Sequence, residues 1–169
     1  MIMTRRLPLI LLLGFTLFAA GRVGGPARTE LRDAEQRLDV SIQQRWVEDP
    51  QVLIGGSRAF YIDGFGVVIT AEINLVTGAR ISPFNQTMSP EVITRHHSRK
   101  LERLPQLKDL LSTTLQQAKG WFPQLRDDEH IALGVQMFRY KWEDASDMPS
   151  QILLQTLKRK DAPIQVQEN

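Results

Sequence analysis

The arrangement of apolar and polar residues indicates the most regular structure in AFYIDGFGVVITAEI, residues 59–73. Two β-rich runs flank Asp63-Gly64, and Asp-Gly is a favoured two-residue hairpin turn because Gly, and Asp better than most residues, tolerates positive φ. The turn predicts three directly opposed pairs on one core face: Ile62 with Phe65, Phe60 with Val67, and Arg58 with Ile69. Tyr61 and Glu72 would lie on the other, mixed face. The pattern therefore predicts a hairpin in an antiparallel sheet that is covered on one side.

Residues 27–49 predict an amphipathic helix, because apolar residues recur there three or four positions apart. This narrow stripe consists of Leu31, Ala34, Leu38, Ile42 and Trp46. A stripe this thin predicts that the helix docks on a sheet edge or against another helix. Glu35 occupies a position where a coiled coil would need an apolar residue, which argues against a long coiled coil.

A second, longer helix is predicted over residues 90–118, with Ser89 as its N-cap. Its apolar stripe is Ile93, His97, Leu101, Leu104, Leu111, Leu115 and Ala118. Pro105 lies inside this pattern and removes a helical hydrogen bond, so we expect a kink or a break into two helices.

Residues 131–142 predict a central strand, and residues 151–162 allow either a helix or a strand, with a slight preference for a strand. Residues 163–169 are expected to be a polar tail. The fold class predicted is α+β in one domain over 28–162: a mainly antiparallel sheet with a central β-hairpin, one long kinked helix packed on it, and an N-terminal amphipathic helix.

The first 27 residues have the layout of a signal peptide. Arg5 and Arg6 precede an apolar run over residues 7–20, and small residues then permit cleavage after Gly21 or as late as Ala27. This run is shorter than the roughly 20 residues that a membrane-spanning helix needs. A buried N-terminal helix and an uncleaved membrane anchor are the alternatives. We expect an exported, periplasmic protein, attached to the inner membrane only if the leader is retained.

The charge and cysteine content limit the kinds of partner and site that the sequence supports. Removing residues 1–21 leaves 19 of the 21 Lys and Arg residues, against 19 Asp and Glu residues, so the exported domain is neutral. Bulk charge thus gives no argument for nucleic acid as a partner. The sequence has no cysteine, which excludes disulfides, thiol nucleophiles and zinc–thiolate sites.

The segment RHHSRKLER, residues 95–103, is a basic patch on the long helix. Its candidate binding residues are Arg95, His96, Arg99, Lys100 and Arg103, which could contact an anionic head group or an acidic partner. The alternative is an ordinary solvated helix face. Tyr61 and Trp142 are aromatic binding candidates, although aromatics at the ends of elements more often cover the core.

Metal chemistry is the competing interpretation. His96 and His130, with Asp127 and Asp128, supply the imidazole and carboxylate ligands of a metal-dependent periplasmic hydrolase. The spacing is not a metal motif, because adjacent histidines on a helix diverge by about 100°. No serine lies in a nucleophile motif and no cofactor motif is present, so no catalytic residue and no cofactor are assigned.

Five segments occur in a familiar order: FYIDGFGVVITAEINLV, ISPF, RKLERLPQLKDLL, HIALGVQMFRYKWED and PSQILLQ. In this order the chain resembles an exported, functionally uncharacterised family of environmental Gram-negative bacteria. The resemblance implies export and a single intact domain, and it implies no catalytic residue. The function that we expect is a non-catalytic binding or scaffolding module of the cell envelope, whose partner is another envelope protein or a further copy of the same chain.

Overall fold

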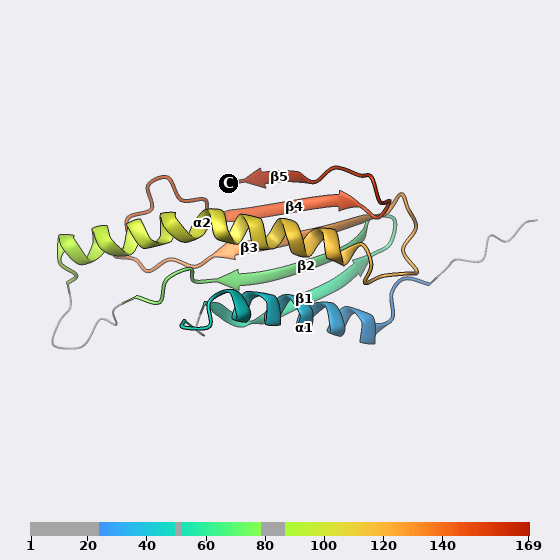
Figure 1. Cartoon of the computed structure of the whole chain (residues 1–169), viewed down its shortest axis with the longest axis horizontal. Helices are drawn as coiled ribbons and strands as arrows, with labels where there is room; N and C mark the ends of the chain where they lie inside the picture. Colours follow the sequence, from blue (N-terminus) through green and yellow to red (C-terminus); the bar gives the residue numbers. More distant parts are fainter. Residues whose placement is uncertain (1–23, 50–51, 79–86) are drawn as a thin grey trace, which may run out of the picture.

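The computed structural model describes residues 24–49, 52–78 and 87–169. Two helices, α1 (Arg28–Arg45) and α2 (Pro90–Ala118), pack on a sheet of five strands (Figure 1). The strands are β1 (Leu53–Ile62), β2 (Gly66–Ile73), β3 (His130–Met137), β4 (Gln151–Leu157) and β5 (Gln165–Glu168). The predicted α+β class with a mostly antiparallel sheet is confirmed.

The strands lie side by side in chain order. Three of the four neighbouring pairs are antiparallel, whereas β2 and β3 are parallel and are connected through α2. A parallel pair needs such a crossover, since a short turn can only reverse the chain. Residues 151–157 form a strand, which settles the helix-or-strand alternative for most of that segment.

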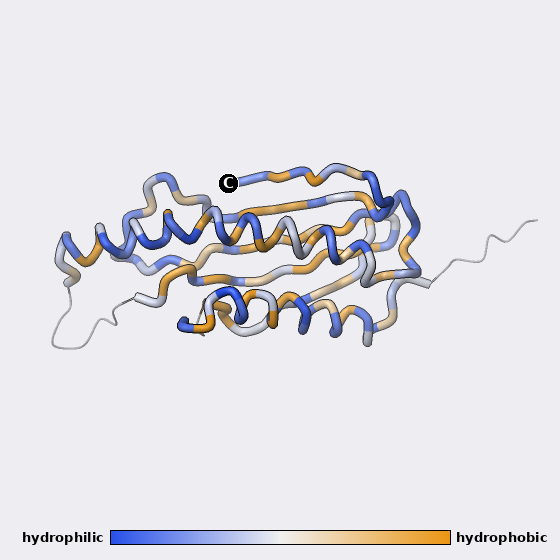
Figure 2. The backbone as a smooth tube through the Cα atoms, in the orientation of Figure 1, coloured by the Kyte–Doolittle hydropathy of each residue, from blue (hydrophilic) through white to orange (hydrophobic). Residues whose placement is uncertain are grey.

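The core lies between the two helices and one face of the sheet. Hydrophobic residues recur along the strands and on both helices (Figure 2). Alternate residues of β2, from Val67 to Ile73, are buried in this core, whereas every residue of β3 from Ile131 to Val135 is buried. Helix α2 packs on β3 and β4, and α1 packs on β1 and beside α2.

The hairpin has a three-residue loop, so the predicted pairing is wrong by one residue. Ile62 pairs with Gly66 and Phe60 pairs with Val68, and Phe65 donates its N–H to the Ile62 carbonyl at 3.0 Å. Gly64 and Gly66 both have positive φ, of 79° and 127°. The extra loop residue does not change which side chains of β2 face the core. In β1 it exchanges the two faces, so that the side chains predicted to face the core lie on the opposite side of the sheet.

Helix α1 closes the β1 edge of the sheet, which confirms docking on an edge. The outward N–H groups of β1 are bonded by α1 carboxylates: Glu35 accepts from Ala59 N at 2.8 Å and Asp39 accepts from Ser57 N at 2.9 Å. An edge strand left open would be a template for pairing with another chain. The charge of Glu35 argued against a coiled coil, and in the structure its carboxylate binds the backbone of β1 instead.

Helix α2 continues through Pro105, which lies on the solvent side, so the predicted break into two helices is not observed. Its C-terminal half buries the expected leucines. In its N-terminal half the expected stripe through His97 and Leu101 is wrong by one position, because His96 and Lys100 are the buried residues. The prediction followed the spacing of apolar residues along the helix. It failed at this end of α2 because the buried positions there are polar.

The segment expected as a polar tail contains β5, an edge strand whose residues are all exposed. The predicted leader lies mainly in residues 1–23, which are outside the described residues. Within the described part of the chain, no helix is both long and apolar enough to span a bilayer.

Candidate functional site

A buried ion cluster joins α2 to the segment after β3. The Lys100 Nζ atom lies 2.5 Å from Glu143 Oε2 and donates to the Phe138 carbonyl at 3.0 Å. His96 Nε2 approaches Glu143 Oε1 at 3.1 Å, an electrostatic contact that is not aligned as a hydrogen bond. The side chains of Lys100 and Glu143 are each only 3% exposed, so this charge pair is removed from water.

Aromatic rings surround this cluster. The rings of Tyr140 and Trp142 stack with centroids 5.3 Å apart, and the Trp142 ring meets His96 edge-on at 5.0 Å. The Tyr140 N–H also donates to Glu143 Oε1 at 3.1 Å. Trp142 is thus half-buried against His96 and Tyr140, which favours the core-lid alternative over an exposed anchor.

The environment shifts two pKa values. Burial opposes ionisation of Glu143, but its contacts with His96, Lys100 and the Tyr140 N–H outweigh burial and lower the pKa of the carboxyl below its ordinary value. Burial lowers the pKa of Lys100 in spite of Glu143 beside it. With its oxygens occupied from three sides, the carboxylate holds the two segments together and has no access to a substrate.

The predicted basic patch is divided between the interior and the surface. Lys100 is committed to Glu143, and Arg103 donates to Asp49 at 2.9 Å and to the Leu75 carbonyl at 2.6 Å. Arg95 and Arg99 are exposed. The five candidates therefore do not form one cationic surface.

Tyr61 holds β1 to the start of β3. Its hydroxyl donates to Glu129 Oε1 at 2.7 Å, and this hydrogen bond raises the pKa of the phenol. Glu129 is buried and also accepts from the Arg126 N–H at 2.8 Å. The role of Tyr61 in the fold is thus an internal tether.

The structure does not bring the candidate metal ligands together. His96 lies near the residues that follow β3, whereas His130 begins β3, and a strand of this length extends over about 23 Å. Asp127 and Asp128 are exposed, and His130 stacks on Phe65 with centroids 4.9 Å apart. No group of three metal-ligating side chains occurs among the described residues.

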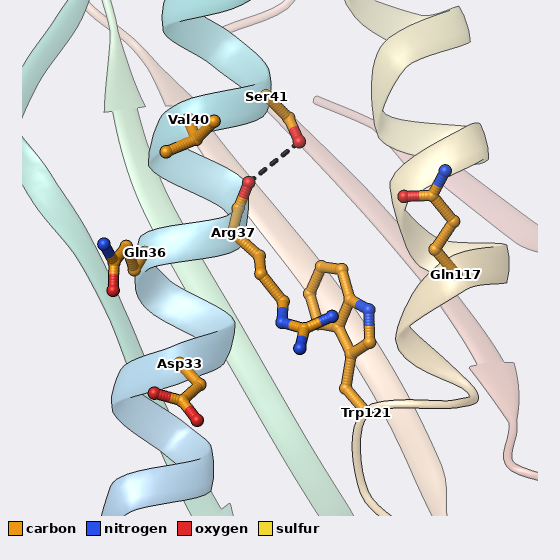
Figure 3. A pocket seen from close by; sticks show the side chains of 7 residues that line it. All are labelled: Asp33, Gln36, Arg37, Val40, Ser41, Gln117 and Trp121. Atoms are coloured by element: carbon orange, nitrogen blue, oxygen red, sulfur yellow. Dashed lines mark hydrogen bonds between the residues drawn. The ribbon is translucent and has the colours of Figure 1, made fainter.

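A groove between α1 and the C-terminal end of α2 was missed by the sequence analysis. It encloses about 530 Å³ (Figure 3). Its lining residues are Asp33, Gln36, Arg37, Val40 and Ser41 from α1, with Gln117 and Trp121 from the end of α2 and the turn after it. Residues this far apart in sequence give no local motif. The one available signal was Val40, an apolar residue on the polar side of the α1 stripe.

The guanidinium of Arg37 lies over the ring of Trp121, 5.6 Å from its centroid (Figure 3). This cation–π contact fixes the charge between the two helices. Val40 beside it is 40% exposed, and Ser41 Oγ donates to the Arg37 carbonyl at 2.8 Å. The groove thus combines a positioned cation, an aromatic wall and an uncovered apolar side chain.

Comparison of the chain with protein-family models, with curated proteins and with solved structures finds no match.

Proposed function

We propose that the chain is an exported, non-catalytic binding module that holds a segment of another envelope protein in the groove between α1 and α2. The observation that carries the proposal is the Arg37–Trp121 pair beside the exposed Val40. Pockets that bind peptides and small molecules combine apolar walls with a few positioned polar groups, and this groove has that composition.

The groove favours an occupant with an acidic side chain next to an apolar one. A guanidinium presents paired N–H donors to a carboxylate, and stacking on Trp121 restricts Arg37 before a ligand arrives. The apolar neighbour would contact Val40 and the indole. The amides of Gln36 and Gln117 stand on the two walls and can bond the backbone of a peptide.

The polar groups of the groove favour binding over catalysis. Asp33 and Arg37 are the ionisable residues that line it, and they are one helical turn apart on α1. Nucleophilic catalysis needs a nucleophile within hydrogen-bond reach of a base, and this lining set contains no histidine and no lysine. The buried cluster at Glu143 supports the fold at a different place.

Export is proposed from residues 1–27 alone. If the leader is cleaved, the N-terminus of the protein recovered from cells begins at Arg22 or Arg28. A protein that begins at Met1 and fractionates with the cytosol would contradict export while leaving the groove proposal untouched.

In-cell photo-crosslinking tests the groove. A photoreactive amino acid at Val40 should give one discrete crosslinked product with an envelope protein, and the same amino acid at Thr113, an exposed position of α2 outside the groove, should not. Arg37→Glu should reduce the product by about tenfold, a change of about 1.4 kcal/mol in binding. Arg32→Glu makes the same charge change elsewhere on α1 and should leave it intact. Equal products from Val40 and Thr113, or insensitivity to Arg37→Glu, would refute this function.

A further inference from the structure

A second groove lies on the β1 side of α1, between the start of this helix and the strand. It encloses about 650 Å³. Three arginines line it from two elements: Arg28 and Arg32 lie one helical turn apart on α1, and Arg58 lies on β1. We call it the arginine groove. It concentrates positive charge in a predicted exported domain whose total charge is neutral.

The three arginines have no acidic partner in the part of the chain that the structure describes, where other basic residues form the salt bridges. Glu35 is the one carboxylate among the lining residues, and it accepts the Ala59 N–H at 2.8 Å. Arg58 donates to the Ser57 carbonyl at 2.8 Å, a neutral acceptor that positions the guanidinium without neutralising it. The positive charge of the groove therefore remains available to an external anion.

The groove also has an apolar wall. Phe60 lines it beside Arg58 and is 43% exposed, and the half-buried Leu31 lines it from α1. Guanidinium groups present paired N–H donors that match the oxygens of a phosphate. Arginines next to an exposed aromatic ring suit a phosphate that carries an apolar group.

The polypeptide reaches this groove directly from the predicted leader. Pro26 lines the groove, and a Cβ at Gly25 would collide with the Tyr61 ring, so the segment before α1 lies against β1. The start of α1 and the turn between β1 and β2 lie at the same end of the molecule (Figure 1). Arg28 follows Ala20, the end of the apolar run, by eight positions, a reach of at most about 29 Å. A leader retained in the bilayer would thus hold the groove near the membrane surface.

We propose that the arginine groove binds the phosphate of an anionic phospholipid head group, with the apolar part of the lipid against Phe60. Charge complementarity and the position of the predicted leader both favour a lipid over a soluble anion, and inorganic phosphate would leave the apolar wall without a contact. The site is separate from the groove between α1 and α2, and it is also separate from the exposed Arg95 and Arg99 of α2.

Vesicle co-sedimentation of the protein purified from cells expressing the full chain tests the site. Vesicles of phosphatidylcholine alone are compared with vesicles that also contain phosphatidylglycerol, at physiological ionic strength. The anionic vesicles should bind more tightly by about tenfold or more, and Arg28→Glu should remove most of this gain. This variant should fold, because an acidic side chain in the first turn interacts favourably with the helix dipole. Arg58→Glu tests the opposite wall of the groove and should have the same effect.

Arg99→Glu is the matched control, because it makes the same charge change on the exposed side of α2 and should leave the gain intact. Circular dichroism verifies the fold of each variant. Equal losses from Arg28→Glu and Arg99→Glu would assign the binding to net charge and overturn the proposal. Equal affinities for the two kinds of vesicle would overturn it as well. The assay contains no envelope protein, so its outcome is independent of the groove between α1 and α2.

A short-chain lipid separates a phospholipid ligand from free phosphate. Dihexanoyl phosphatidylglycerol, kept below its micelle concentration, should shift the side-chain NMR signals of Arg28, Arg32 and Arg58 and leave that of Arg99 in place. Inorganic phosphate at the same concentration should cause smaller shifts, because it makes no contact with Phe60. Equal shifts from the two probes would assign the groove to a soluble phosphate and overturn the lipid proposal, and equal shifts at all arginines would refute a defined site.

Discussion

Glu35 of α1 accepts a hydrogen bond from the backbone N–H of Ala59 in β1 at 2.8 Å. A helix side chain here takes the place of a neighbouring strand, because the N–H groups of an edge strand otherwise remain available to another chain. The contact also explains why α1 needs only a narrow apolar stripe, since part of its attachment is polar.

Removing this carboxylate should both destabilise the fold and open the edge. Glu35→Ala leaves the Ala59 N–H without its charged acceptor, and we expect a loss of about 1.5–3 kcal/mol in the free energy of unfolding. Urea denaturation measures the loss. Glu48→Ala removes an exposed carboxylate after the same helix and should change stability by less than about 0.5 kcal/mol. Equal effects of the two variants would show that the edge contact is not a source of stability.

The buried pair of Lys100 and Glu143 should behave as one unit. Lys100→Met leaves Glu143 buried without its main partner, and we expect a loss of about 3–5 kcal/mol. Combining it with Glu143→Leu removes the isolated charge, so the double variant should be more stable than Lys100→Met alone. Arg99→Met, on the exposed side of α2, is the control. Additive losses in the double-mutant cycle would contradict the coupling.

Stability should fall at acid pH through carboxylates whose pKa values are lowered in the folded state. Burial works against ionisation at Glu143 and at Asp49, and their polar partners more than compensate, so both pKa values lie below the ordinary carboxyl range. A lowered folded pKa gives stability that is present above the unfolded pKa, about 4, and is lost as pH falls through the folded pKa. Denaturation series from pH 7 downward should show this decline. The decline should be shallower in Glu143→Gln, and an unchanged slope would argue against the assignment.

The hairpin loop makes a prediction about two glycines. A Cβ at Gly66 would run into the backbone carbonyl of His130, and its φ of 127° is strained for any L-residue. Gly66→Ala should therefore cost more than about 3 kcal/mol. Gly64 has a φ of 79° but open space around it, so Gly64→Ala should cost about 1–2 kcal/mol. Thermal unfolding compares the two, and similar losses would contradict the three-residue loop.

Periodicity predicted the elements of this fold well because burial of apolar side chains decides them. The stripe of α1, the leucines in the second half of α2 and the inward residues of β2 are all found where the pattern placed them. The pairing of the hairpin failed because Asp63-Gly64 fits both a two-residue turn and a three-residue loop that continues to Phe65. The turn residues alone do not distinguish these two loops. A difference of one loop residue exchanges the two faces of β1.

The candidate sites were less predictable because they depend on contacts between distant segments. The candidate residues chosen from the sequence did not include Glu143, and only the packing of α2 reveals that it pairs with Lys100. Apolar preference assigned Leu101 to the core, whereas the structure buries Lys100 and leaves Leu101 36% exposed. The groove likewise forms only where α1 packs beside α2, and no local sequence pattern predicts that packing.

The two borders of the sheet differ in how they meet solvent. Beyond β1 lies α1 with its carboxylates, whereas β5 lies beyond β4. The carbonyl of Asn169, directly after β5, accepts from the Ser150 N–H and from the Ser150 hydroxyl. Residues 165–169 therefore pair with the outer edge of β4 and separate it from solvent. The alternate residues Ile152 and Leu154 of β4 belong to the core. Composition alone would suggest that residues 163–169 can be removed without harm. Their removal would expose the backbone edge of β4, which begins with QILLQ, to pairing with other molecules in solution.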